Sequence, residues 1–191
     1  MKSEVKPQNE KVFIEIALNN DNEGIKIDSS KRVQHETGLY TAKVLAIGPR
    51  ALDEEEGCPG LEVGDTVMIS EFAGTNVPTE DGYTKVVEGH NIIIMSKNNL
   101  DIENIIPTGK RLLVEILDED LVQEEGVSYN KSFDPRERET QKGRVVKCGE
   151  LADQYPEGTI VYFDPFVGNI VINEPKRKFK TLFCFDIEFT I

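Results

Sequence analysis

Histidines and paired acids are the residues of this chain that could carry catalysis, and their placement does not favour it. His35 begins the run His35-Glu36-Thr37-Gly38-Leu39, which lacks the second histidine of a zinc protease motif. His90 precedes an apolar run and has no counterpart near it. The paired acids at 118–120 and 124–125 lie in a polar stretch, where solvated charge explains them better than a general acid and base. The sequence therefore predicts no enzyme and no cofactor.

Cysteine usage argues against a metal site as well. Cys58, Cys148 and Cys184 show no C-x-x-C spacing, so we expect neither a disulfide framework nor bound zinc. A reducing compartment fits this pattern. The start Met1-Lys2-Ser3-Glu4 lacks the apolar core of a signal peptide, and no apolar run has the length of a membrane span. We therefore expect a cytoplasmic protein.

Two small apolar islands in long polar stretches are the best candidates for binding. Gly24-Ile25-Lys26-Ile27 lies within 19–37, and Gly126-Val127-Ser128-Tyr129 lies within 118–142. Loops beyond about 12 to 15 residues in a compact domain are usually functional or disordered. If extended, each island presents two apolar side chains on one face. Two interpretations stay open: a recognition arm that orders when it docks in a groove, or a loop that folds back on its own barrel.

An internal repeat must position these islands. Lys11-Val12-Phe13-Ile14-Glu15-Ile16 matches Arg111-Leu112-Leu113-Val114-Glu115-Ile116 one hundred positions later. Phe72-Ala73-Gly74-Thr75 likewise matches Phe166-Val167-Gly168-Asn169. The repeat predicts two domains of roughly 90 residues, at 1–98 and 106–191.

Both halves consist of short β-branched runs between glycine turns, with no stretch of helical periodicity. This pattern predicts an all-β fold of two tandem small barrels, each with a long mobile loop. The alternation of Phe183, Phe185, Ile187, Phe189 and Ile191 predicts one continuous terminal strand. The expected strands are 12–18, 42–47, 66–69 and 92–95, then 112–117, 144–148, 159–163, 170–172 and the terminal run.

The net charge of the chain argues against some classes of partner. The chain has 35 acidic and 22 basic residues, for a net charge of −13, whereas nucleic-acid binding needs a basic face. The dense basic run at 176–178, with Lys180, is interpreted as a solvated turn. We therefore expect neither a nucleic-acid nor a membrane partner, but oligomeric contacts that add to two small cores.

The first half resembles the GroES-type co-chaperonins, the ring-forming caps of group I chaperonins. The order and spacing of its landmarks carry the resemblance: Thr37-Gly38, Val44-Leu45-Ala46-Ile47-Gly48-Pro49, Val63-Gly64-Asp65-Thr66-Val67, Phe72-Ala73-Gly74-Thr75 and Asn91-Ile92-Ile93-Ile94. The resemblance implies a co-chaperonin that assists ATP-dependent folding, with a homo-oligomeric ring and a group I chaperonin as its partners.

The resemblance also implies roles for particular residues. The family's loop tripeptide, which grips the chaperonin, maps onto Ile25-Lys26-Ile27, with Gly24 before it, and Val127, Ser128 and Tyr129 stand at the similar place in the second loop. The family's roof hairpin corresponds to 50–62, which is short here and acidic at Asp53, Glu54, Glu55 and Glu56. Ala42 stands where the family usually has glycine.

The second half departs further from the family. Only 150–157 separates its middle glycines, so the roof hairpin is essentially absent. In this it is similar to the head-assembly co-chaperonins of tailed phages, which implies a viral or bacterial source and, for a virus, the host cytoplasm. Two-domain chains fill only even-numbered rings, whereas the chaperonin is sevenfold, so either the ring mismatches its partner or one domain of each chain lies outside it. The alternative function is a structural or adaptor barrel protein, such as a virion component.

Overall fold

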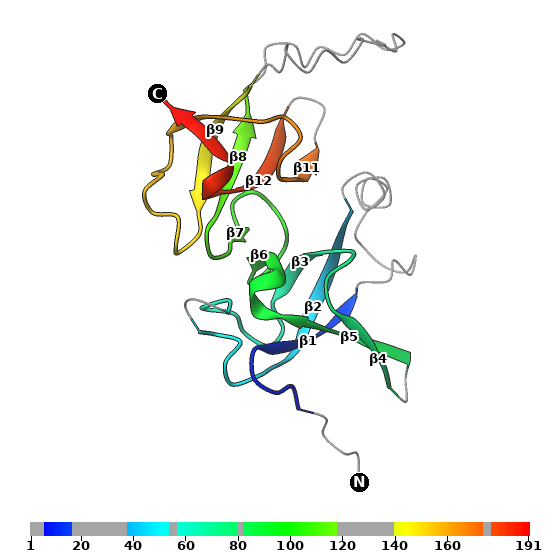
Figure 1. The fold of residues 1–191 in the computed structure, drawn as a ribbon. Coiled ribbons are helices and arrows are strands. Elements are labelled where there is room, and N and C mark those ends of the chain that lie inside the picture. Colours follow the sequence, from blue (N-terminus) through cyan, green and yellow to red (C-terminus); the bar gives the residue numbers. More distant parts are fainter. Residues whose placement is uncertain (1–5, 17–37, 54–56, 80–81, 118–139, 174–176) are drawn as a thin grey trace, which may run out of the picture.

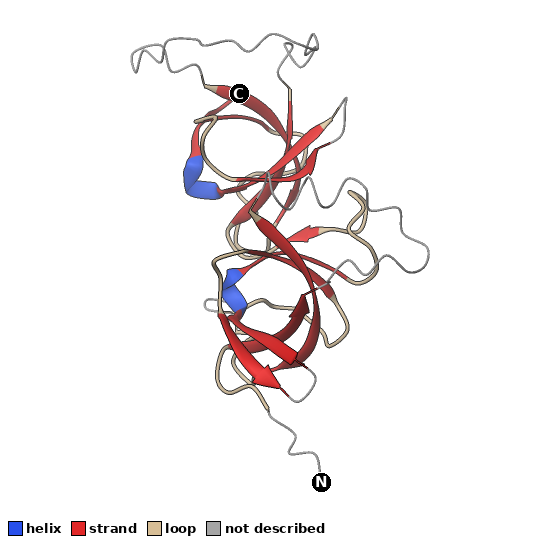
Figure 2. Cartoon of the chain, turned by 90° about the vertical axis from the view of Figure 1, so that its right-hand side faces the viewer, coloured by secondary structure: helices blue, strands red, loops and turns tan. Residues whose placement is uncertain are grey.

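The computed structural model describes residues 6–16, 38–53, 57–79, 82–117, 140–173 and 177–191. In this part of the chain the strands form two antiparallel sheets, one for each half of the sequence, and each sheet curls into a small barrel (Figures 1 and 2). The expected all-β fold with two tandem barrels is confirmed. Among the described residues there is no helix with the length and apolar character of a membrane span.

The first sheet has the strand order β4-β5-β1-β2-β3-β6-β7. Its strands alternate between the buried interior and solvent, as in β1, where Val12 and Ile14 are buried. A short 3-10 turn, η1 (Gly89–Asn91), leads into the last long strand. The strands are β1 (Lys11–Ile16), β2 (Leu39–Ile47), β3 (Thr66–Ser70), β4 (Thr75–Thr79), β5 (Gly82–Glu88), β6 (Ile92–Ser96) and β7 (Ile106–Pro107).

The second sheet has the order β11-β12-β8-β9-β10-β13, which is the order of the first six strands repeated. Even the bulges recur, since the β1–β2 register shifts after Phe13 and the β8–β9 register shifts after Leu113. The strands are β8 (Arg111–Ile116), β9 (Gln141–Cys148), β10 (Ile160–Phe163), β11 (Asn169–Asn173), β12 (Lys178–Phe183) and β13 (Ile187–Thr190), with the 3-10 turn η2 (Cys184–Asp186) between the last two.

One pair of equivalent glycines meets the same structural requirement in both barrels. Gly74 and Gly168 both have φ of 75°, in the left-handed region that glycine tolerates best. A Cβ at Gly74 would lie 2.2 Å from the carbonyl oxygen of Val86, and one at Gly168 would lie 2.3 Å from that of Thr181. The turn after β3 and the turn after β10 therefore both require a residue without a side chain.

The structure corrects two sequence expectations about the end of the second half. The run 183–191 is not one strand, because η2 interrupts the phenylalanine alternation and stacks Phe183 on Phe185, with ring centroids 4.8 Å apart. The basic run is only partly a solvated turn: Arg177 is exposed before the strand, but Lys178 begins β12, and Lys180 is only 6% exposed. The hairpin β4–β5 and the strand β7 were not expected at all.

Each barrel has its own apolar core, and a third cluster joins the two barrels. This shared cluster contains Leu39, Met68, Ile93 and Ile94 from the first sheet, Ile105 from the connecting segment, and Leu113, Val171 and Phe179 from the second sheet. All of these side chains are buried. The two barrels are therefore stacked on a common apolar interface, with β6 and β7 at the junction (Figure 1).

The strand that ends the first half does not lie directly beside the strand that begins the second. β6 instead pairs with the short linker strand β7, with Ile94 opposite Pro107 and Met95 opposite Ile106. Across the junction, Arg111 donates to the main-chain oxygens of Ile92 at 3.2 Å and His90 at 3.1 Å. The outer edge of β6 is thus covered within the chain.

Candidate functional site

Most of the predicted binding residues lie outside the described residues. These are Gly24, Ile25, Lys26, Ile27, Val127, Ser128 and Tyr129, together with Glu54, Glu55 and Glu56 of the predicted roof. Of the predicted roof residues, Asp53 is described. It accepts a hydrogen bond from Nε of Arg50 at 3.1 Å, and its main-chain oxygen accepts one from the Gly57 N–H at 2.8 Å, so it helps to close a surface turn.

The structure does describe the roots from which the two predicted arms leave the barrels. In the first barrel β1 ends at Ile16 opposite Ala42, so the chain leaves and returns on paired strands. In the second barrel Ile116 lies opposite Gly143, and the Leu117 N–H donates to the main-chain oxygen of Lys142 at 3.0 Å. The roots of the two predicted arms therefore lie at equivalent points of the two barrels.

Beside each root lies a turn that carries an exposed phenylalanine. Ser70, at the end of β3, pairs with Leu39, and the next residue, Glu71, donates from its N–H to the main-chain oxygen of Gly38 at 2.9 Å. The following side chain, Phe72, is 87% exposed, and its repeat equivalent Phe166 is 75% exposed. In the sequence this tetrapeptide indicated the repeat and the family resemblance, but nothing in it distinguished an exposed aromatic side chain from a buried one.

Two buried lysines hold these turns. Lys85 donates to the main-chain oxygen of Glu71 at 2.8 Å, and Lys180 donates to those of Pro165 at 2.5 Å and Val167 at 3.2 Å. Burial lowers the pKa of Lys85, which the nearby Glu71 carboxylate partly opposes. Lys85 and Lys180 thus provide hydrogen-bond donors to main-chain oxygens of the two turns.

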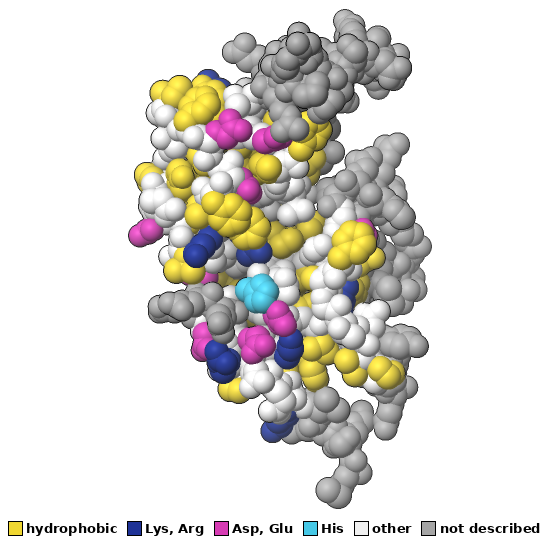
Figure 3. Space-filling view, in the orientation of Figure 1, with side chains coloured by type: hydrophobic (Ala, Val, Ile, Leu, Met, Phe, Trp, Pro, Cys, Tyr) yellow, Lys and Arg dark blue, Asp and Glu magenta, His cyan; other side chains and the backbone are white. Residues whose placement is uncertain are grey.

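The free edge of β13 is a second candidate surface. β13 is the last strand of its sheet, whereas its equivalent β6 is covered by β7. Tyr162 and Phe189 stack near this edge with centroids 4.4 Å apart, and Phe189 and Ile191 are 48% and 83% exposed. Figure 3 shows apolar side chains at this free end of the second barrel. An exposed apolar edge strand is a site where another chain can pair.

A group of charged side chains lies near the middle of the molecule (Figure 3). Lys11 hydrogen-bonds and ion-pairs with Glu88, and His90 Nε2 lies 3.3 Å from the other carboxylate oxygen of Glu88 (Figure 3). The hydrogen bond with Lys11 lowers the pKa of Glu88 and raises that of Lys11. This group is a surface ion pair beside the junction of the barrels.

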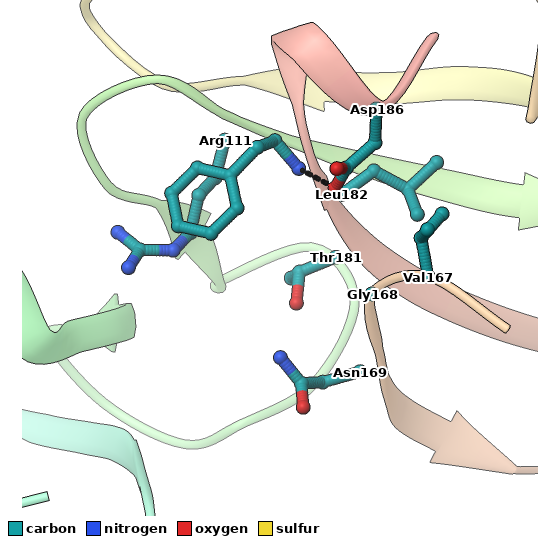
Figure 4. Close-up of a pocket in the computed structure, with 8 residues that line it drawn as sticks. Arg111, Val167, Gly168, Asn169, Thr181, Leu182 and Asp186 are labelled. Atoms are coloured by element: carbon teal, nitrogen blue, oxygen red, sulfur yellow. Dashed lines mark hydrogen bonds between the residues drawn. The ribbon is translucent and has the colours of Figure 1, made fainter. Parts of the chain in front are cut away.

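A cavity of about 320 Å³ lies between β8, β12 and the turn before β11. Its lining includes Arg111, Asn169, Thr181 and Asp186, but Figure 4 shows the guanidinium of Arg111 directed away from Asn169. The Asp186 carboxylate is occupied by the N–H of Phe183 at 2.9 Å. The charged groups here serve the junction of the barrels and the η2 turn, not a ligand.

The buried thiol of Cys58 is poorly suited to cysteine chemistry. Burial raises the pKa of Cys58 to about 12, so its thiol stays protonated and weakly nucleophilic. Cys148 and Cys184 are half-buried free thiols. The part of the chain that the structure describes contains no cluster of three metal-ligating side chains. The described surfaces are suited to binding other proteins.

Comparison with known proteins agrees with this picture for the first half. The family model described as "Chaperonin 10 Kd subunit" matches residues 4–95, which contain β1 to β6, the root of the first predicted arm and the Phe72 turn. No curated protein matches the chain. A co-chaperonin kind of function follows from the family, which is in general not enzymatic.

Proposed function

Residues 4–95 belong to the chaperonin 10 family, and we propose that the whole chain is a tandem co-chaperonin that caps a group I chaperonin and assists ATP-dependent protein folding. The observation that carries the proposal is the strand order of the second sheet, which repeats that of the first from β8 to β13. We propose domain limits of 1–98 and 106–191. The chain acts by binding and not by catalysis.

The binding elements of this proposal are the arm residues Gly24 to Ile27, with Val127, Ser128 and Tyr129 as the second set. Burying Ile25 and Ile27 in an apolar groove supplies roughly 1.5–3 kcal/mol for each side chain. Ordering even five residues of a free loop costs on the order of 5–10 kcal/mol. One arm alone is therefore weak, and several arms on one ring bind tightly because each docked arm raises the effective concentration of the others.

The ring of this proposal repeats, between chains, the contact seen between the two barrels. Pro7 stands four residues before β1, as Pro107 stands four residues before β8. Asn9 and Gly109, two residues later, both adopt positive φ, 52° and 60°. The segment that leads into β1 therefore has the backbone of the segment that contains β7, and it suits a strand edge of the β6 type.

The free edge of that type is β13. Phe189 lies opposite Tyr162 as Ile94 lies opposite Met68, so the register of β7 on β6 places the Pro7 of another copy opposite Phe189. Leu45, which is 42% exposed, corresponds to Val146 of the shared cluster and would be covered by this contact. Repeating one head-to-tail contact yields a closed ring if the rotation closes.

Removal of β13 tests the ring. A chain that ends at Asp186 keeps β12, whose Leu182 is buried in the second core, and loses the free edge together with Ile187, which packs against that core. Native mass spectrometry should show monomers for this truncation and a closed oligomer for the full chain, and the mass of that oligomer counts the chains. A truncated protein of full oligomeric mass would refute the head-to-tail contact.

Nucleotide-dependent capping tests the function itself. The full chain should sediment with a group I chaperonin in the presence of ATP and not without nucleotide. A chain that forms rings but never associates with the chaperonin would favour the structural or adaptor alternative. We further propose a cytoplasmic location, in the host if the source is a virus, and no nucleic-acid or membrane partner, which the net charge of −13 supports.

A further inference from the structure

The two exposed phenylalanines are the feature that the proposed arms and ring do not use. Phe72 and Phe166 occupy equivalent turns, and water reaches most of both side chains. The halves have diverged around them, since Ser70-Glu71 precedes Phe72 and Asp164-Pro165 precedes Phe166. An aromatic side chain kept in two diverged copies of a turn, and buried in neither, is available for a contact with something outside the chain.

Both turns are fixed by hydrogen bonds before any partner arrives. The Ala73 N–H donates to the main-chain oxygen of Ser70 at 3.0 Å, and the Val167 N–H donates to that of Asp164 at 3.1 Å. The Phe166 N–H also donates to Oδ1 of Asp164 at 2.8 Å. With the lysine contacts to the same turns, these bonds hold the main chain that carries each phenylalanine. Docking them costs little backbone order, in contrast to an arm.

The contact between the barrels covers neither phenylalanine. In that contact the first barrel uses its β6 side and the second barrel uses its β8, β11 and β12 side, yet Phe72 and Phe166 remain exposed on their respective barrels. A ring that repeats this contact uses the same two sides at every position. Chain-to-chain packing therefore leaves both side chains open to a different partner.

Their position identifies that partner. Phe72 is next to Glu71, which is hydrogen-bonded to the root of the first arm at Gly38. Phe166 follows β10, whose Phe163 pairs with Gln141 at the root of the second arm. We propose that Phe72 and Phe166 form a second, pre-ordered apolar contact with the chaperonin surface that each neighbouring arm engages. This inference rests on the proposed co-chaperonin function.

The experiment compares four proteins for ATP-dependent binding to a group I chaperonin: the full chain, Phe72→Ser with Phe166→Ser, Ile25→Ser with Ile27→Ser, and the control Val63→Ser. Val63 is 65% exposed and lies beyond the other end of β3, away from the arm roots. Native mass and circular dichroism should be unchanged in all four, because each substituted side chain that the structure describes is exposed.

The double variant Phe72→Ser with Phe166→Ser should bind the chaperonin on the order of tenfold or more weakly, since each substitution removes a large apolar contact. Val63→Ser should change it less than about twofold. Binding by the phenylalanine variant as tight as that of the full chain would overturn the inference while leaving the co-chaperonin function standing. No binding by the full chain would overturn both, so the two failures are distinguishable.

Discussion

The two barrels of this chain share a framework and differ in what surrounds it. Both keep the strand order, the bulge in the first strand pair, the glycine with φ of 75° and the buried lysine that holds the adjacent turn. They differ at the strand edges, because β6 is covered by β7 and β13 is bare. The shared residues therefore maintain the barrel, and the differences lie at the edges where each barrel contacts a neighbour.

The largest expected effect concerns the predicted arms. Ile25→Ser with Ile27→Ser should abolish capping of the chaperonin, whereas Val127→Ser with Tyr129→Ser should only weaken it, because the first island matches the family's tripeptide and the second departs from it. Co-sedimentation with ATP measures both. Equal loss from the two double variants would show that the arms are equivalent.

Glycine substitutions should damage the two barrels alike. Gly74→Ala and Gly168→Ala should each destabilise its barrel by about 3–5 kcal/mol, since positive φ and a close main-chain oxygen penalise the same Cβ. Gly64→Ala is the matched control, because its φ is 96° but nothing lies within 4 Å of the added Cβ, so only the conformational cost of about 1–3 kcal/mol applies. Urea unfolding measures the three variants. A control as damaging as the others would remove the packing argument.

Substitution of the buried lysines should destabilise the two barrels by slightly different amounts. Lys180→Met should cost about 2–3 kcal/mol and Lys85→Met about 1–2 kcal/mol, because Lys180 donates to two main-chain oxygens and Lys85 to one. Thermal unfolding of the single variants would check the order. The reverse order would indicate that the second hydrogen bond of Lys180 contributes nothing.

The smallest effect is an acid dependence confined to the first barrel. The pKa of Glu88 is lowered in the folded state by Lys11, so the ion pair stabilises fully above the ordinary glutamate range and is lost as pH falls through the lowered value. Arg111 and Phe183 occupy the equivalent positions in the second barrel, where the guanidinium stacks over the ring at 4.5 Å. This second pair contains no carboxylate that acid could protonate. Glu88→Gln should therefore reduce the pH dependence of unfolding between neutral and acid pH, and an unchanged profile would contradict the assignment.

The sequence predicted the repeat and the barrels because glycines and β-branched runs recur at fixed spacing. It missed β4 because Thr75–Thr79 is polar and contains Pro78, and it missed β7 because Ile106–Pro107 is too short to show a period. It read 183–191 as one strand because phenylalanines keep their alternation through η2, although the backbone turns there. Lys180 was assigned to a solvated turn because it follows a dense basic run, and the sequence gives no sign that main-chain oxygens of another turn lie within reach of its ammonium group.

The candidate site was likewise predicted from the sequence only in part. Composition marked the apolar islands as candidates and left two interpretations open, the family resemblance implied their role as arms, and their residues lie outside the described part of the chain. Phe72 and Phe166 required the structure, because only burial distinguishes an exposed aromatic from a core one. The repeat showed that Phe72 and Phe166 are equivalent, but it did not show that they lie near the arm roots. In the first barrel the pairing of β2 with β3 brings the Phe72 turn beside the root.

The shared cluster between the barrels also sets an order of events during synthesis. Leu39, Met68, Ile93 and Ile94 of the first barrel are covered only when Val171 and Phe179 of the second have been made. At roughly 5–20 residues per second a ribosome needs several seconds to reach them. During that interval the nascent first barrel displays an apolar face, so the chain itself passes through a stage in which it is prone to aggregate.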